Sequence, residues 1–320
     1  MSEHFIKNIE IKNYKCFDDF KAEGFGRVNL IGGKNNVGKT AFMEAIYVNV
    51  HSKNTKQFSY SSYCLKMHRE KINILMRPDI NYKDKFMEQS NQMFTKSNIY
   101  KTFFEMKDID SVKKYYFNLN DKEILVNFKE FSFDIEIVAN TIFIDNFGLG
   151  NDDIISNYAS VQKKDEEQYL NDLLKLLDPS IEAFKIIYEK PQCKVKGNYL
   201  EITEFGDGVK HLISIITSLY ASENGYLFID EIDNGIHYTL LDDIWKVILQ
   251  ISEKLNVQVF ATTHSKECIE SYARVAKRLE DKEITFTKLT KLKDNSIVAG
   301  VRDYEMIQYA MEDGHEVRGW

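Results

Sequence analysis

The segment GGKNNVGKT, residues 32–40, has the residue types and the spacing of a phosphate-binding loop. Gly33 is followed by four residues and then by Gly38, Lys39 and Thr40, a pattern in which a glycine-rich turn wraps around phosphate groups. Glycine allows backbone N–H groups to approach phosphate oxygens without obstruction by side chains. The candidate phosphate-binding residues are Gly33, Lys34, Asn35, Asn36, Val37, Gly38, Lys39, Thr40 and Ala41.

The segments on either side of this loop predict a strand before it and a helix after it. Residues 27–31, RVNLI, form a short apolar run, and residues 41–50 place apolar side chains at helical spacing. A helix that begins near Gly38 would point its positive end at the bound phosphate. Lys39 would reach the terminal phosphates, and the hydroxyl of Thr40 would bind Mg²⁺.

A second candidate group of residues follows the apolar run YLFIDE, residues 226–231. The carboxyl end of such a buried strand lies beside the phosphate loop in folds of this kind. Asp230 would hold Mg²⁺, directly or through water. Glu231 is one residue further along and points differently, so it is placed to orient and deprotonate an attacking water.

A third segment is predicted to end beside the same phosphate loop. Residues 238–255 have the apolar periodicity of a helix, and residues 257–265, VQVFATTHS, predict another buried strand that ends in polar residues. His264 would lie at the end of this strand, near the terminal phosphate. We therefore include His264 with Glu231 among the candidate catalytic residues.

These three segments together resemble an ABC-class ATPase, and more narrowly the branch that contains SMC, RecF and OLD (overcoming lysogenization defect) proteins. The resemblance covers both ends of the chain and is weak in between. It implies an α/β fold: an ABC-type P-loop ATPase with a central mixed sheet flanked by helices, an antiparallel β lobe and a small helical insertion. It also implies that the chain binds and hydrolyses ATP with Mg²⁺.

Two further segments belong to this resemblance. The opening IKNIEIKNYKCF is similar to the first strand and basic turn of the branch, and Lys15 matches its phosphate-facing basic residue. The stretch DEIDNGIHY is similar to the DE-x-E/D-x-x-LH segment of the branch, in which Asp233 to His237 would form the loop that meets a second subunit.

The best match to the signature loop of the branch is EFGDGVKHLISIITSLY, with Gly206, Asp207 and Gly208 at the start of a helix. In the branch this loop closes on the ATP of the partner subunit, which implies a homodimer that forms when ATP binds. The usual serine is Gly206 here. Because a hydroxyl bond to the γ-phosphate is then absent, we expect hydrolysis to be slow.

The composition of the chain limits which binding partners and which cellular locations can be expected. The net charge of −7 argues against an electrostatic grip on nucleic acid by the whole chain, although 42 lysines and arginines could form a local patch. The N-terminus lacks the apolar segment of a signal peptide, and no apolar run has the length of a membrane span. The four cysteines are scattered and indicate neither a zinc site nor a disulfide framework. We expect a cytoplasmic protein that does not bind membranes.

For the domain organisation, we predict a nucleotide-binding core made of residues 1–57 and 195–320, and an inserted lobe at residues 58–194. Within the lobe, residues 58–110 indicate mixed helix and loop, and residues 115–147 an antiparallel meander that includes a strand at 131–138 and the segment NTIFIDNF. A helix at 164–177 and a hairpin around Lys196-Gly197-Asn198 follow. Residues 284–320 predict one strand, a turn at Asp294-Asn295 and a helix.

The C-terminal segment has no carboxylate cluster of the kind that a TOPRIM nuclease needs, and its ending resembles stand-alone ATPase subunits of the branch. Such subunits are often encoded beside a separate effector, as in OLD-like anti-phage systems such as PARIS. The resemblance thus implies a sensor or regulatory subunit with a separate TOPRIM-type nuclease or toxin, triggered by DNA or a phage protein. A RecF-like DNA-repair clamp, the ATP-binding subunit of a transporter and a kinase remain as alternatives.

Overall fold

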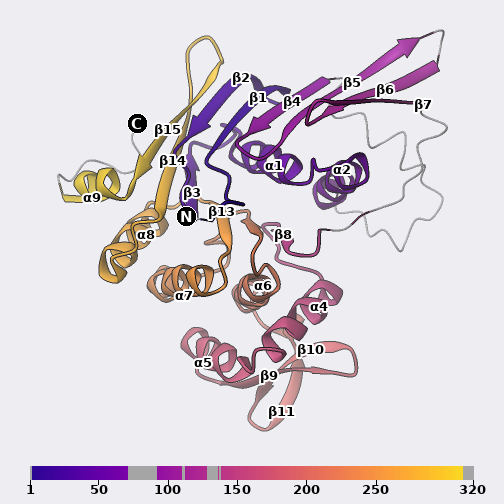
Figure 1. Cartoon of the computed structure of the whole chain (residues 1–320). Helices are drawn as coiled ribbons and strands as arrows, with labels where there is room; N and C mark the ends of the chain where they lie inside the picture. The colour runs from indigo at the N-terminus through magenta and orange to yellow at the C-terminus, as the bar shows by residue number, and fades with distance from the viewer. Residues whose placement is uncertain (1, 71–91, 110–111, 128–135, 137, 313–320) are drawn as a thin grey trace.

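The computed structural model describes residues 2–70, 92–109, 112–127, 136 and 138–312. These residues form two large sheets and a smaller three-stranded sheet, with helices between and around them (Figure 1). No helix in these ranges is both long enough and apolar enough to cross a bilayer.

The central sheet is a mixed sheet whose strands are in the order β15-β14-β3-β13-β12-β8. The five strands from β14 to β8 are parallel, and β15 at the edge is antiparallel to β14. All the parallel strands therefore end at the same edge. The strands are β3 (Val28–Gly33), β8 (Thr141–Ile144), β12 (Tyr226–Ile229), β13 (Gln258–Thr262), β14 (Ile284–Lys291) and β15 (Ile297–Asp303).

The second large sheet is antiparallel throughout, with the order β2-β1-β4-β5-β6-β7. Its strands are β1 (Asn8–Tyr14), β2 (Phe17–Glu23), β4 (Gln92–Ser97), β5 (Lys101–Ile109), β6 (Val112–Leu119) and β7 (Lys122–Asn127). One face of this sheet, one face of the central sheet and helix α1 (Lys39–Val50) share a single apolar core. Because α1 lies between two sheets, almost every one of its side chains is buried.

The other face of the central sheet is covered by three helices, α6 (Asp207–Ala221), α7 (Leu241–Lys254) and α8 (Lys266–Leu279). The strands supply alternate side chains to the two cores: Leu227 and Ile229 of β12 face these helices, and Phe228 between them faces α1. Further elements are α2 (Thr55–Glu70), α4 (Asn151–Gln162), α5 (Glu167–Leu177), β9 (Ile181–Ile187), β10 (Lys190–Val195), β11 (Asn198–Glu201) and α9 (Tyr304–Glu312).

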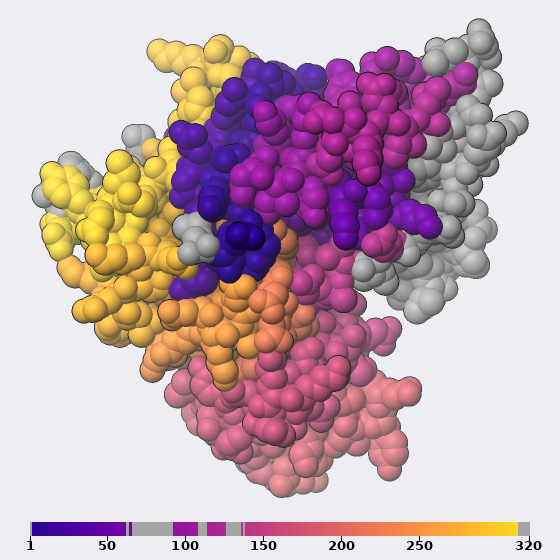
Figure 2. Space-filling model, in the orientation of Figure 1, coloured from indigo at the N-terminus to yellow at the C-terminus, as the bar shows by residue number. Residues whose placement is uncertain are grey.

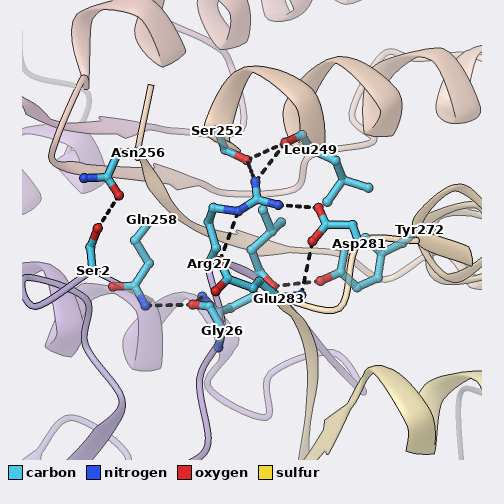
Figure 3. A network of polar contacts seen from close by, with 12 residues as sticks. Ser2, Gly26, Arg27, Leu249, Ser252, Asn256, Gln258, Tyr272, Asp281 and Glu283 are labelled. Atoms are coloured by element: carbon cyan, nitrogen blue, oxygen red, sulfur yellow. Dashed lines mark hydrogen bonds and ion pairs between the residues drawn. The ribbon is translucent and has the colours of Figure 1, made fainter. Parts of the chain in front are cut away.

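A buried arginine fixes the amino end of β3 against its neighbours (Figure 3). Arg27 is only 3 % exposed, and its Nη1 donates to the carbonyl oxygen of Leu249 at 2.8 Å and to the hydroxyl of Ser252 at 2.5 Å, both on α7. Its Nη2 pairs with Asp281 in the connection between α8 and β14. One guanidinium thus joins β3, α7 and the start of β14, and it holds the strand that leads into the phosphate loop.

Several predictions about secondary structure are confirmed. The central mixed sheet, the separate antiparallel sheet, the helices at 164–177 and 238–255 and the hairpin at Lys196-Gly197 are all present. The predicted strand at 131–138 lies almost entirely outside the described residues.

Three predictions are wrong. Residues 92–97 and 101–109 are strands β4 and β5 instead of helix and loop, and β4 pairs with β1, which is distant in the sequence. The segment NTIFIDNF contains β8, which pairs in parallel with β12 of the central sheet instead of joining the meander. Residues 284–312 contain a second strand, β15, which forms a hairpin with β14. Both large sheets thus include strands from residues 58–194; the division into a core and an inserted lobe stays a prediction about separately folding units.

Candidate functional site

The predicted phosphate loop joins the end of β3 to the start of α1. Gly33 and Gly38 have φ angles of 150° and 99°, and Asn36 has a φ of 60°, so the loop uses left-handed backbone at three positions. A Cβ at Gly38 would lie 2.6 Å from Sγ of Cys16, and a Cβ at Gly33 would lie 2.7 Å from the carbonyl oxygen of Leu289. Both the backbone conformation and the close packing therefore require glycine at these two positions.

The side chain of Lys39 lies across this loop. Its Nζ is 3.1 Å from the carbonyl oxygens of Gly33 and Lys34 and 3.0 Å from Nδ1 of His264. Burial lowers the pKa of Lys39, and the charges of Asp230 and Glu231 oppose this shift. A bound phosphate would supply the additional negative charge that a buried ammonium group needs.

Oxygen atoms suited to a magnesium ion meet at the start of α1. The hydroxyl of Thr40 is 3.1 Å from each carboxylate oxygen of Asp230, and the hydroxyl of Thr262 donates to Oδ1 of Asp230 at 2.6 Å. Burial raises the pKa of Asp230, and the hydrogen bonds from the two threonines oppose the shift. Hard oxygen ligands on two adjoining elements fit Mg²⁺, which usually takes few protein ligands and completes its shell with phosphate and water.

Glu231 and His264 lie beside each other at the same sheet edge. Nε2 of His264 is 3.2 Å from Oε1 of Glu231, and the two side chains are 37 % and 39 % exposed, so both can meet water. Glu231 has a φ of 53°, and its backbone N–H donates to the hydroxyl of Thr262 at 2.8 Å. A glutamate in left-handed backbone costs conformational energy, which the surrounding contacts must offset. Through His264, Glu231 is connected to Lys39.

Lys15 lies in the turn between β1 and β2 and faces α1. Its Nζ pairs with Oε2 of Glu44 at 2.5 Å, and Glu44 is only 2 % exposed. Glu44 stands one helical turn after Thr40, so Lys15 lies near the start of α1. Its contact with phosphate stays a prediction.

Residues 206–208 form the amino end of α6, with Gly206 as the residue that precedes the helix. A Cβ at Gly208 would lie 2.2 Å from the carbonyl oxygen of Gly235, and Gly235 has a φ of 70°. The backbones of the predicted signature loop and of the loop after Glu231 are thus in direct contact. Each segment resembles a separate motif of the branch, and neither sequence predicts this contact.

Two further residues at the functional edge were missed by sequence reasoning. Asp145 and Asn146 follow β8, whose carboxyl end lies beside that of β12, and the backbone N–H of Asp230 donates to the carbonyl oxygen of Ile144 at 2.9 Å. The side chain of Asn234 donates to the carbonyl oxygen of Asn146. The sequence feature that could have predicted this position is the similarity of TIFIDN to YLFIDE, since both are apolar runs that end in polar residues.

A cavity of about 320 Å³ lies next to the phosphate loop. Its walls contain polar groups of the loop and of the end of β13 on one side and an apolar surface on the other. The lining residues are Gly33, Lys34, Asn35, Thr263, His264, Ile269 and Phe286. The site therefore offers a space beside the phosphate loop that could take part of a nucleotide.

The sequence of this chain is similar to those of several known proteins. The family described as "AAA domain, putative AbiEii toxin, Type IV TA system" matches residues 94–270. An "ATP/GTP phosphatase" of Helicobacter pylori is 25 % identical over 98 % of this chain and 100 % of its own length. A shorter segment, 14 % of this chain and 12 % of the relative, is 48 % identical to the DNA replication and repair protein RecF of Bacillus cytotoxicus.

Solved structures show the same fold. An SMC head bound to the C-winged helix domain of ScpA covers 94 % of this chain and 99 % of its own length, with a TM-score of 0.54 and 11 % identity. An SMC head domain with an extended coiled coil, bound to the C-terminal domain of ScpA derived from Pyrococcus furiosus, also gives a TM-score of 0.54, at 12 % identity and 98 % coverage of this chain. The predicted ABC-type α/β fold is confirmed.

Proposed function

The chain belongs to the family described as "AAA domain, putative AbiEii toxin, Type IV TA system", and from this membership we propose that it is the ATP-hydrolysing sensor and regulatory subunit of a bacterial anti-phage defence complex. The protein is an ATPase of the SMC, RecF and AAA type. The observation that best supports the proposed reaction is that Lys39, Thr40, Asp230, Glu231 and His264 meet at one edge of the central sheet.

In the proposed reaction each residue has a separate task. Lys39 places a positive charge on the terminal phosphates. Thr40 and Asp230 would hold Mg²⁺, which would neutralise charge that develops on the phosphates. Glu231 orients the attacking water and accepts its proton, and His264 holds the carboxylate of Glu231 in place at 3.2 Å.

We propose that ATP binding forms a homodimer in which residues 206–208 of each subunit close on the nucleotide of the other. A helix N-terminus with little side-chain bulk is suited to bind phosphate through backbone N–H groups. A two-fold arrangement would place each such end against the other phosphate loop. Mixing Lys39→Ala subunits with Gly206→Trp subunits tests this, because a Cβ at residue 206 meets no atom within 4 Å in its own subunit. A mixed dimer has one intact composite site, so activity should return, and no recovery would contradict the arrangement.

We further propose that a separate effector, a TOPRIM-type nuclease or a toxin, is held inactive by this subunit until DNA or a phage protein triggers release in the cytoplasm. The toxin–antitoxin wording of the family description supports a role in such a module. The SMC heads of similar fold bind a separate protein, ScpA, and a partner of this chain would sense domain movements that accompany ATP turnover. Within the branch, we propose that the chain is related to OLD-like subunits such as those of PARIS.

Expression of the native operon tests the proposal directly. A tagged subunit should co-purify with the product of an adjacent gene, and cells that carry the operon should resist phage. Lys39→Ala should remove protection, because it removes the charge that binds the phosphates. Purification as a lone dimer together with absence of protection would refute the defence role.

The local match to RecF supports a second candidate, an ATPase clamp in DNA repair. This alternative predicts that duplex DNA alone stimulates ATP hydrolysis by the purified chain, without any other protein. The defence proposal predicts that stimulation, whether by DNA or by a phage protein, requires the effector to be present. Steady-state ATPase rates with and without duplex DNA therefore separate the two.

A further inference from the structure

The antiparallel sheet has an outer face that the ATPase site does not use. Side chains of β1, β4, β5 and β6 alternate between the buried core against α1 and this outer face. The outer positions of β4, β5 and β6 combine aromatic and basic side chains, and these strands form magenta surface at the upper right of Figure 2. We refer to Phe94, Phe103 and Tyr116 together with Lys96, Lys101, Lys107 and Lys114 as the outer aromatic face.

Three aromatic rings form a row across this face. Phe94 on β4 is directly opposite Phe103 on β5. The ring of Phe103 lies 5.9 Å from that of Tyr116 on β6, at an interplanar angle of 66°. All three side chains are partly exposed, and Leu125, opposite Tyr116 on β7, is 59 % exposed. Such rings on an open sheet offer flat apolar surfaces to a ligand that can stack.

Two pairs of lysines flank the row of rings. Lys96 is directly opposite Lys101, and Lys107 is directly opposite Lys114. Like charges in directly opposed positions destabilise a sheet. Asp121 pairs with Lys101 at 2.7 Å and Glu105 pairs with Lys107 at 2.8 Å, so each pair has one lysine partly neutralised by a neighbouring carboxylate. Glu10 on β1 is directly opposite Lys96 and pairs with Lys12 at 3.1 Å, and Glu123 forms a hydrogen bond with Tyr116, so lysines exceed carboxylates on this face only slightly.

The dimensions of the face suit an extended anion. Lys101 and Lys107 are six residues apart on one strand, which corresponds to about 20 Å. The three rings lie between them. A ligand with repeating negative charges and flat rings between those charges would match both features at once. An acidic peptide would match the lysines but would make no use of the rings.

We propose that the outer aromatic face binds single-stranded nucleic acid, with phosphates at the two lysine pairs and bases stacked on Phe94, Phe103 and Tyr116. Stacking on aromatic side chains requires bases that are not already paired and stacked, which excludes the interior of a duplex. Because the net charge of the chain is −7, nucleic acid would bind through one local face and not through the whole surface. The inference is independent of the proposed function, because it concerns binding that needs neither ATP nor an effector.

Fluorescence anisotropy with the full chain tests the proposal. The probes are labelled oligothymidylate and oligouridylate of about 12 nucleotides and a duplex of equal length, at about 50 mM salt. Lys96→Gln combined with Lys114→Gln should lower single-strand affinity and should reduce the slope of log K against log salt by about 1.4, which is about 0.7 for each phosphate contact. The matched control is Lys163→Gln combined with Lys293→Gln, which removes the same charge from exposed sites elsewhere.

A second pair of variants separates stacking from charge and from folding. Phe103→Leu keeps an apolar side chain but removes the flat ring, and it should weaken binding by roughly 5- to 100-fold. Phe103→Trp keeps a ring and should preserve binding. The ATPase rate of each variant, measured in parallel, verifies that the chain is folded.

Each outcome of these measurements either supports or overturns the proposal. Loss of binding in the lysine double variant and in Phe103→Leu, with the control and Phe103→Trp unaffected, supports the proposal, and the thymidylate and uridylate arms show whether DNA or RNA is preferred. Absence of single-strand binding overturns it. Equal loss in the control variant, tighter binding of the duplex, or an unchanged affinity of Phe103→Leu also overturns it, because each indicates charge attraction without stacking.

Discussion

The contact between Gly208 and Gly235 gives the sharpest test of the site geometry. A Cβ on residue 208 would lie 2.2 Å from the carbonyl oxygen of Gly235 and 3.1 Å from its carbonyl carbon. Real Cβ atoms essentially never lie within 3.0 Å of such an atom, so Gly208→Ala must displace one backbone segment by about 1 Å. Gly235 cannot give way by a simple rotation, since its φ of 70° already lies in the left-handed region.

The expected magnitude follows from this displacement. Overpacking of this kind costs about 1–3 kcal/mol, which should lower the melting temperature by about 1.5–4.5 °C in a chain of this size. A misplacement of about 1 Å can reduce a catalytic rate about 100-fold. Because residue 208 is proposed to act on the nucleotide of the partner subunit, the affinity of one subunit for ATP should change little while kcat falls.

The assay is phosphate release at saturating ATP, with thermal melting and binding of a fluorescent ATP analogue measured in parallel. Gly300→Ala is the matched control, because no atom lies within 4 Å of a Cβ at that position, which is on β15 away from the site. The control should keep both the rate and the melting temperature. If Gly208→Ala melts and hydrolyses ATP like the wild type, the inferred contact between the two loops is wrong.

Further predictions concern the base, the signature loop, a buried histidine and the arginine network. Glu231→Gln should retain ATP binding and reduce turnover at least about 100-fold in a phosphate-release assay, because the general base is lost; a wild-type rate would exclude Glu231 as the base. Gly206→Ser should raise kcat several-fold, since a Cβ there meets no atom within 4 Å and the hydroxyl would add a donor to the γ-phosphate; an unchanged or lower kcat would count against this role. Burial lowers the pKa of His51 to about 4, so at pH values below 6.5 the unfolded chain binds a proton at this residue more readily than the folded chain does. The free energy of unfolding should therefore fall by about 2 kcal/mol between pH 8 and pH 5. In denaturant titrations, His51→Phe should lose this part of the pH dependence. Arg27→Met should destabilise the fold by about 3 kcal/mol because it leaves Asp281 unpaired, whereas Arg278→Met, at a surface pair, should cost less than about 1 kcal/mol.

The phosphate loop was predictable because its chemistry is local. Gly33, Gly38, Lys39 and Thr40 are close in sequence, and a backbone that must approach phosphate restricts which residues can occur there. The strand that ends in Asp230 and Glu231 was predictable for a similar reason, since a buried parallel strand reads as a short apolar run that stops at polar residues. Apolar runs that end in polar residues, together with the rule that parallel strands end at one edge of the sheet, therefore sufficed to place these side chains together.

The antiparallel sheet was not predictable in the same way. In β4 and β5 the outer face combines lysines with aromatic residues, so the alternation of apolar and polar residues that indicates a strand is obscured. The pairing of β4 with β1 joins residues that are more than 80 positions apart, such as Ile11 and Thr95. No local pattern specifies such a partner. The same applies to β8, whose four residues fit either a meander or the parallel sheet.

The loop that follows β12 explains how the separate elements of the site could act together. Glu231 contacts the end of β13 through its backbone and His264 through its carboxylate. Asp233 accepts a hydrogen bond from the end of β13, Asn234 donates to the loop after β8, and Gly235 packs on the backbone of Gly208. Four residues of this loop thus contact two strand ends and the start of α6. Because packed backbones do not deform independently, a change in the position of Glu231 on nucleotide binding has to be shared with the amino end of α6, the part of the subunit proposed to meet its partner.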